Sequence, residues 1–181
     1  MSRERLLERI DQVVESSARA LFGANGLTLG ELITEAGDVP RDHDIACSIG
    51  FTSGEISGAV LMTTRKEIIA RSWPAELRHR EPTERDICDW AGELVNQLLG
   101  RVKNALARSG VTLRQCTPTV VLGWHVHRAP ACTTVARAYA FGVGEGLLLV
   151  YFDAAVTESF ALPESEDPAL TSIAEGGVQL F

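Results

Sequence analysis

Apolar residues recur at helical spacing in two long stretches of the chain, one near its start and one in its middle. The first stretch predicts a helix over residues 3–22, which a glycine-rich turn ends. The second predicts a helix that begins after the N-cap Thr83 and runs to Arg108. A shorter helix is expected over residues 65–72, because a Trp-Pro pair follows it.

Short segments with the composition of β-strands follow each long helix in groups of three. The predicted strands cover residues 27–34, 45–52, 55–62, 111–122, 133–141 and 146–153. The turn Ser53-Gly54 joins the second segment to the third as a hairpin. The order predicts an α+β fold, in which two helix-plus-three-strand halves form one sheet of about six strands with two long helices packed on it.

The composition changes after residue 153. The remaining stretch contains several acidic residues, prolines and glycines, and its apolar residues follow no clear period. We therefore expect one domain over residues 1–153 and an acidic C-terminal tail over residues 154–181, to which the pattern assigns no structure.

Charge and cysteine usage restrict the class of protein. The formal net charge is -7 and no basic stripe is present, so nucleic acid is not an expected partner. No signal peptide is recognised, and no apolar run approaches the ~20 residues of a membrane span. The four cysteines (Cys47, Cys88, Cys116 and Cys132) form no CxxC pair, and we expect buried, reduced thiols in a cytoplasmic protein.

The polar face of the second long helix has an unusual composition. At about 100° per residue, five positions fall within roughly 80° of the helix circumference. They are Asp89, Glu93, Asn96, Gly100 and Lys103. Glycine inside a helix costs about 1 kcal/mol relative to alanine, and asparagine is a weak helix former. A solvated face would explain the charges alone, whereas the glycine and the asparagine favour a face that another chain approaches.

Two other groups of residues suggest different chemistry. His125 and His127 would share one face of a strand and could bind a metal together with Cys132. Ordinary imidazoles at a strand end are favoured instead, because no third ligand has convincing spacing. His43 is interpreted as a loop histidine. A Cys–His nucleophilic pair stays open, although nothing marks one cysteine as activated. No phosphate-binding glycine loop is present, which disfavours ATP and dinucleotides.

The unusual helix face and a proline further along resemble the CheC/CheX/FliY group of chemotaxis phosphatases, and CheX most of all. The resemblance covers roughly residues 5–153, and it includes only one E-x-x-N motif, because the first helix lacks one. The matching positions are Asp89-x3-Glu93-x2-Asn96, then Gly100, then Pro118-Thr119-Val120-Val121-x-Gly123.

This resemblance implies a CheC-like fold and a phosphatase acting on the phosphoaspartate of a CheY-like response regulator. Asn96 would orient the attacking water and Glu93 would pair with the receiver's lysine. Asp89, Gly100, Lys103 and Pro118 would contact the partner or present the helix to it. The protein would need no cofactor of its own, because the Mg²⁺ would belong to the receiver domain, and it would form a homodimer.

Two further interpretations keep the same fold. The motif helix would serve as a docking surface in a non-catalytic CheX-like module, or the chain would be a structural protein resembling those of the flagellar switch. The presence of both Glu93 and Asn96 favours the enzyme.

Overall fold

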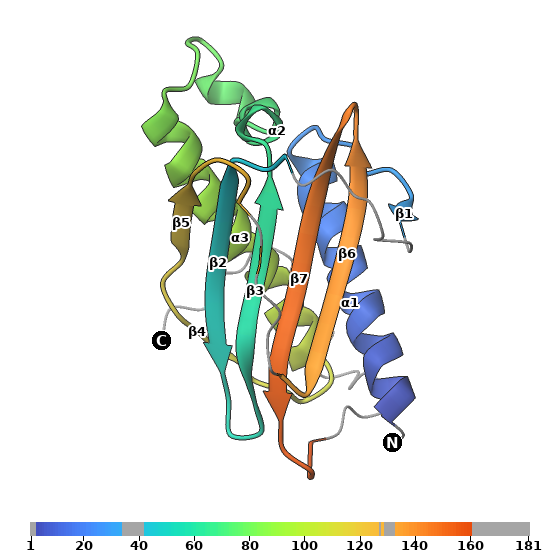
Figure 1. Cartoon of the computed structure of the whole chain (residues 1–181). Coiled ribbons are helices and arrows are strands. Elements are labelled where there is room, and N and C mark those ends of the chain that lie inside the picture. The colour runs from blue at the N-terminus through green and yellow to red at the C-terminus, as the bar shows by residue number, and fades with distance from the viewer. Residues whose placement is uncertain (1–2, 34–41, 127, 129–132, 161–181) are drawn as a thin grey trace.

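The computed structural model describes residues 3–33, 42–126, 128 and 133–160. Its helices and strands form two layers, with a sheet in front of two long helices (Figure 1). In chain order the elements are α1 (Arg3–Ala24), β1 (Leu32–Ile33), β2 (Ile45–Thr52), β3 (Ile56–Thr64), α2 (Lys66–Arg71), the 3-10 turn η1 (Ala75–Leu77), α3 (Glu84–Ala107), β4 (Arg114–Gln115), β5 (Thr119–Leu122), β6 (Val135–Val143) and β7 (Gly146–Val156).

All strand pairs in the sheet are antiparallel. The strand order is β1-β6-β7-β3-β2-β4, and β5 pairs with β2 beside β4. The central pair therefore brings together β3 of the first half and β7 of the second half, with Val60 opposite Phe152. The predicted α+β fold, with two similar halves forming one sheet under two long helices, is confirmed.

Three strand predictions differ most from the structure in extent, and two others, for β3 and β6, are displaced by one or two residues at each end. The expected strand over residues 27–34 is reduced to β1, because Leu27 and Leu29 instead pack into the core as loop residues. The expected strand over 111–122 is divided into β4 and β5. Pro118 lies in the gap, where it has no N–H to donate to a sheet. The last strand, β7, continues three residues beyond its expected end at residue 153.

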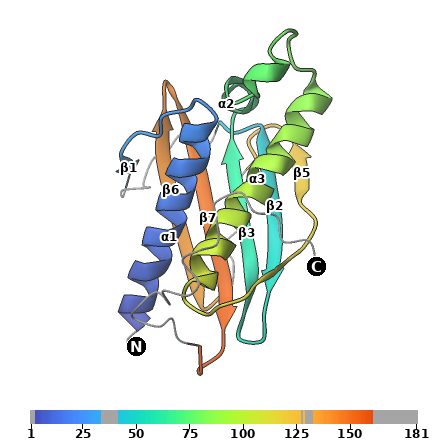
Figure 2. The same ribbon diagram turned by 180° about the vertical axis from the view of Figure 1, so that it is seen from behind.

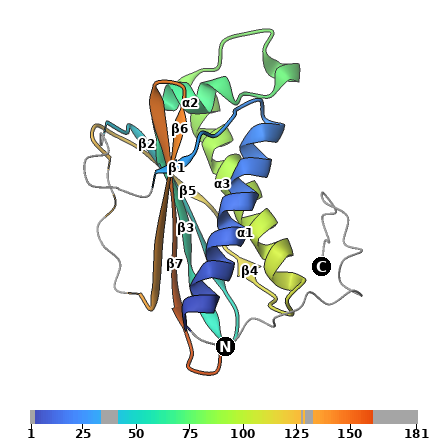
Figure 3. The same ribbon diagram turned by 90° about the vertical axis from the view of Figure 1, so that its right-hand side faces the viewer.

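Both long helices cover the same face of the sheet, as the view from behind shows (Figure 2). Most of the apolar side of α3 lies in the core, as the helical spacing predicts, and Ile87 and Ala105 are partly buried against it. Its buried residues are Ala91, Gly92, Leu94, Val95, Leu98, Leu99, Val102 and Leu106. Seen from the side, α1 and α3 lie on one side of the sheet (Figure 3). The polar side of α3 consequently remains available for contacts.

The start of α3 is held by a capping box. Thr83 accepts a hydrogen bond from the backbone N–H of Asp86, and the Asp86 carboxylate accepts from the backbone N–H of Thr83. The guanidinium of Arg80 donates to both Asp86 oxygens, and these bonds, with those from Thr83, hold the pKa of Asp86 well below its usual range. At the other end, Gly110 has a φ of 77°, a conformation that suits glycine after a helix.

The first helix is tied to the sheet by a polar cluster. Arg137 of β6 forms a forked ion pair with Asp11 of α1, and the Tyr139 hydroxyl donates to the same carboxylate at 2.7 Å. Burial, together with the hydrogen bond to Asp11, raises the pKa of Tyr139 above its usual range.

None of the described helices is both long enough and apolar enough to span a membrane.

Candidate functional site: a groove beside α3

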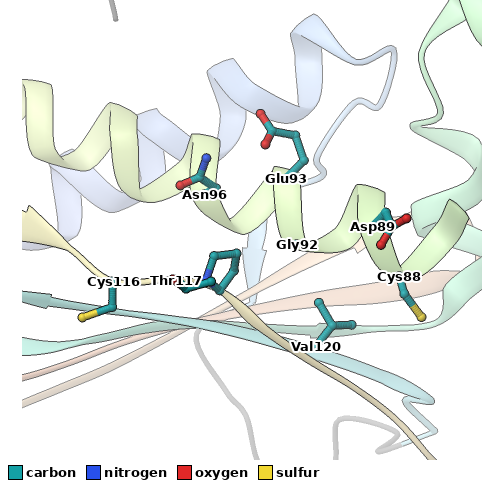
Figure 4. Close-up of a pocket in the computed structure, with 9 residues that line it drawn as sticks. Cys88, Asp89, Gly92, Glu93, Asn96, Cys116, Thr117 and Val120 are labelled. Carbon is teal, nitrogen blue, oxygen red and sulfur yellow. The ribbon is translucent and has the colours of Figure 1, made fainter. Parts of the chain in front are cut away.

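A shallow groove of about 510 Å³ runs along the polar side of α3. Asp89, Glu93 and Asn96 line it, together with Cys88 and Gly92 of the same helix. Figure 4 shows the Glu93 and Asn96 side chains at neighbouring positions of the helix, with the Glu93 carboxylate pointing away from the sheet. Three of the five polar-face residues expected from the sequence therefore share one concave surface.

The remaining two residues of this face, Gly100 and Lys103, are not among the groove-lining residues. Both are partly exposed and lie further along α3. A Cβ added at Gly100 would meet no atom within 4 Å, apart from the helix's own backbone and chain neighbours. Packing within the chain therefore does not explain the glycine at this position.

The second wall of the groove comes from the segment that joins β4 to β5. It comprises Cys116, Thr117, Pro118 and, in β5, Val120. The helix and this wall approach closely, because a Cβ added at Gly92 would lie 3.4 Å from a Val120 methyl group and 3.9 Å from the Pro118 ring. Pro118, expected to help present the helix, is thus placed directly across the groove from it.

Both motif residues, Glu93 and Asn96, accept a hydrogen bond from a glutamine side chain. The Gln115 Nε2 donates to the Asn96 Oδ1 at 2.9 Å, and the Gln97 Nε2 donates to the Glu93 Oε1 at 2.8 Å. Asp89 lies 3.9 Å from the Arg85 guanidinium, but both side chains are so exposed that this ion pair contributes little. Carboxylate and amide oxygens thus remain at the surface, where a partner can reach them.

The cysteines of the described region do not support a thiol nucleophile. Burial, with the nearby charges of Glu84 and Asp89, raises the pKa of Cys88, which keeps its thiol protonated. Within the described residues, no histidine is hydrogen-bonded to a cysteine. The expectation of buried thiols holds for Cys47 but is wrong for Cys116, which is exposed at the groove, and Cys88 is only partly buried.

Of the residues considered from the sequence for a metal site, only His125 lies in the described part of the chain. The segment at His125 is a bend with a φ of 52°, not a continuation of β5. His127 and Cys132 lie outside the described residues. In the described parts of the chain, no three His, Cys, Asp or Glu side chains cluster as a metal would require. His43 is a loop residue, but it is only 3% exposed, and its Nδ1 lies 2.9 Å from the Thr63 hydroxyl.

Sequence reasoning missed several residues that line the groove or lie beside it. Gly92 carried a signal, because it is a second glycine inside the helix pattern. Gln115 and Cys116 carried none, because they look like ordinary positions of a strand that the structure divides. Only the packing of α3 against the β4–β5 segment brings them to the motif.

Comparisons with known proteins agree with this architecture. The chemotaxis protein CheX from Vibrio vulnificus is 19% identical, with a TM-score of 0.68, and the match covers 80% of this chain and 95% of that one. A CheC-like superfamily protein from Shewanella sp. PV-4 is 19% identical, with a TM-score of 0.66 and coverage of 81% and 97%. CheX in a CheX-CheY-BeF3-Mg²⁺ complex from Borrelia burgdorferi is 11% identical, with a TM-score of 0.58 and coverage of 82% and 96%. At these identities the likeness shows the fold.

The family itself is shown by the sequence match. No curated protein is significantly similar to the chain in sequence. Residues 45–138, just over half of the 181 residues, match the family described as chemotaxis phosphatase CheX. This match includes all of α3 and the β4–β5 segment that form the groove. The chain therefore belongs to the CheX family of chemotaxis phosphatases.

Proposed function

We propose that this protein hydrolyses the phosphoaspartate of a CheY-like receiver domain that docks on the groove beside α3. The observation that carries the proposal is the placement of Glu93 and Asn96 side by side on the groove, in a chain of the CheX family. The Borrelia burgdorferi relative was solved as a complex with CheY, BeF3 and Mg²⁺, which supports a receiver as the partner.

The residue types suit hydrolysis by a positioned water. The Asn96 amide can donate one hydrogen bond and accept another, so it can aim a water at phosphorus without acting as a strong base. The water oxygen bonds to phosphorus as the bond from phosphorus to the receiver's aspartate breaks. The electron pair of that bond stays on the aspartate as a carboxylate, and the water's proton passes to phosphate or solvent.

The other groove residues would hold the partner in place. The Glu93 carboxylate would pair with the receiver's lysine, and Asp89 would support the contact from the preceding turn of α3. Pro118 would shape the opposite wall of the groove, while Gly100 and Lys103 would meet the receiver further along the helix. A divalent cation bound by the receiver would neutralise phosphate charge, so no metal site is assigned to this chain.

The replacement of Gly100 by alanine is expected to stabilise the protein but weaken docking. In α3, alanine should raise the free energy of unfolding by about 0.5–1 kcal/mol, because the added methyl meets free space. The same methyl would keep a docked receiver from the helix axis, and we expect the half-saturating receiver concentration to rise about fivefold or more. Urea unfolding and dephosphorylation kinetics measure the two effects.

Gly23→Ala is the matched control for this variant. Gly23 lies in the last turn of α1, and a Cβ there also meets nothing within 4 Å. It should change stability in the same direction without changing receiver kinetics. If Gly100→Ala left the half-saturating concentration unchanged, the receiver would not approach α3 at this residue.

The decay of phosphorylated receivers tests the proposal directly. Each CheY-like receiver of the source organism is phosphorylated with a small-molecule phosphodonor, and its decay is followed with and without the wild-type protein. Acceleration of at least one receiver is the expected result. Binding of a phosphorylated receiver without faster decay would instead support the docking module, and no acceleration of any receiver would refute the phosphatase.

The homodimer and the cytoplasmic location stay predictions. One feature compatible with a dimer is the edge of β6, which β1 pairs only at Ala140 and Phe141. The Gly142 carbonyl also accepts from the Gly30 N–H, whereas no described strand pairs with the remaining part of this edge, whose backbone groups a strand of a second copy would satisfy.

A further inference from the structure

We propose that Gln115 is a positioning residue that fixes the orientation of the Asn96 amide for attack on the phosphoaspartate. The inference rests on the proposed function, because it assigns a role to a residue acting through Asn96. Its starting point is the 2.9 Å hydrogen bond from the Gln115 Nε2 to the Asn96 Oδ1, which joins β4 to α3 across 19 residues of sequence.

The side-chain amide of an asparagine on an exposed helix face can adopt two orientations, which exchange the positions of Oδ1 and Nδ2 by rotation about the Cβ–Cγ bond. Its oxygen only accepts hydrogen bonds and its nitrogen only donates them, so the two orientations present opposite chemistry to a water. A donor from Gln115 favours the orientation in which the Oδ1 faces β4. Figure 4 shows the Asn96 oxygen on the side of Cys116, the residue after Gln115, and the nitrogen turned away from it.

In this orientation both the oxygen and the nitrogen of the Asn96 amide can still form hydrogen bonds to the reacting groups. A carbonyl-type oxygen has two lone pairs, so the Asn96 Oδ1 can accept from Gln115 and also from the attacking water. The Nδ2 remains free to donate toward the phosphoryl oxygens. The amide then holds the water with one atom and the phosphoryl group with the other, without a rotation during the reaction.

Gln115 is anchored well enough to serve this role. Its backbone pairs with Phe51 of β2, and the next N–H, that of Cys116, donates to the Gly50 carbonyl at 2.9 Å. On the other side, Leu113 is only 1% exposed and ties the segment to the core. The side chain therefore extends from a backbone that is held by hydrogen bonds to β2 and by the burial of Leu113.

The test compares Gln115→Ala and Gln115→Glu with the wild type in receiver dephosphorylation at varied receiver concentration. Alanine removes the donor, and glutamate offers an acceptor that would attract the Asn96 Nδ2 and favour the wrong orientation. We expect the maximal rate to fall about three- to tenfold for alanine and further for glutamate, with an unchanged half-saturating concentration. In an Asn96→Ala background, neither change should reduce the residual rate further.

Gln12→Ala, at an exposed position of α1, is the matched control and should behave as the wild type. A second readout needs no catalysis: the side-chain amide of Asn96 in the uncomplexed protein should become more mobile by NMR relaxation in Gln115→Ala. A higher half-saturating concentration with an unchanged maximal rate would make Gln115 a docking contact and overturn the inference, as would additive losses with Asn96→Ala.

Failure of the inference is distinguishable from failure of the proposed function. An active wild type with unaffected Gln115 variants and an equally ordered Asn96 amide removes the positioning role alone. A wild type that accelerates no receiver removes the phosphatase function, and the role of Gln115 falls with it.

Discussion

Replacement of Asn96 by alanine is expected to lower the rate of receiver dephosphorylation at least about 100-fold, with the fold intact. The amide is the one group in the groove assigned to aim the water, and no other described side chain of the groove duplicates it. Asn96 is only partly buried and lies outside the apolar core, so its loss creates no cavity. Single-turnover decay of the phosphorylated receiver measures the effect.

Asn104→Ala provides the matched control on the same helix. Asn104 is also partly exposed and lies two turns beyond Asn96, away from the groove. It should leave the rate near that of the wild type. Binding of the phosphorylated receiver by Asn96→Ala should persist, because Glu93 and the rest of the surface remain. A variant that kept more than about one-tenth of the wild-type rate would exclude the amide from the water-positioning step.

The second large effect is expected in the sheet, where Gly58→Ala should destabilise the protein by about 3 kcal/mol or more. A Cβ at Gly58 would lie 2.0 Å from the backbone oxygen of Asp153 and 2.8 Å from the Ala154 Cα. These are backbone atoms of the paired strand β7, so no side-chain rotation relieves the overlap. A loss of this size is a large part of the stability of an ordinary domain. Urea unfolding followed by tryptophan fluorescence measures it.

Gly54→Ala is the comparison for this variant. Gly54 lies in the turn between β2 and β3, and a Cβ there meets nothing within 4 Å. Its effect should stay within about 0.5 kcal/mol. If Gly58→Ala unfolded with nearly the wild-type free energy, the β3–β7 spacing would be able to relax, and the strand pair would not depend on glycine here.

Local signals made the helix α3 predictable in detail. Thr83 and Asp86 form the cap at its start, and Gly110 takes up the left-handed conformation just beyond its end. Each of these features depends on residues within a few positions of one another, so the sequence contains all the necessary information. The division of α3 into an apolar and a polar face was predictable for the same reason, because the helix period alone determines it.

Strand boundaries were less predictable where pairing depends on distant segments. Residues Thr119 to Leu122 form β5 and pair with β2. Cys116 lies after the end of β4, and its backbone N–H donates a hydrogen bond to the Gly50 carbonyl of β2. Nothing in residues 111–122 marks the interruption except Pro118. The exposure of Cys116 follows from this interruption, which is why the expectation of a buried thiol failed there.

By itself, the sequence determined the order of helices and strands, the α+β class, and the face of α3 that carries Asp89, Glu93 and Asn96. These depend on local periodicity and capping, which act over a few residues. Only the tertiary structure decided that the segment from Cys116 to Val120 forms the opposite wall of the groove, and that Gln115 donates a hydrogen bond to Asn96. Those contacts depend on how closely α3 packs against the sheet edge, a distance that no local pattern encodes.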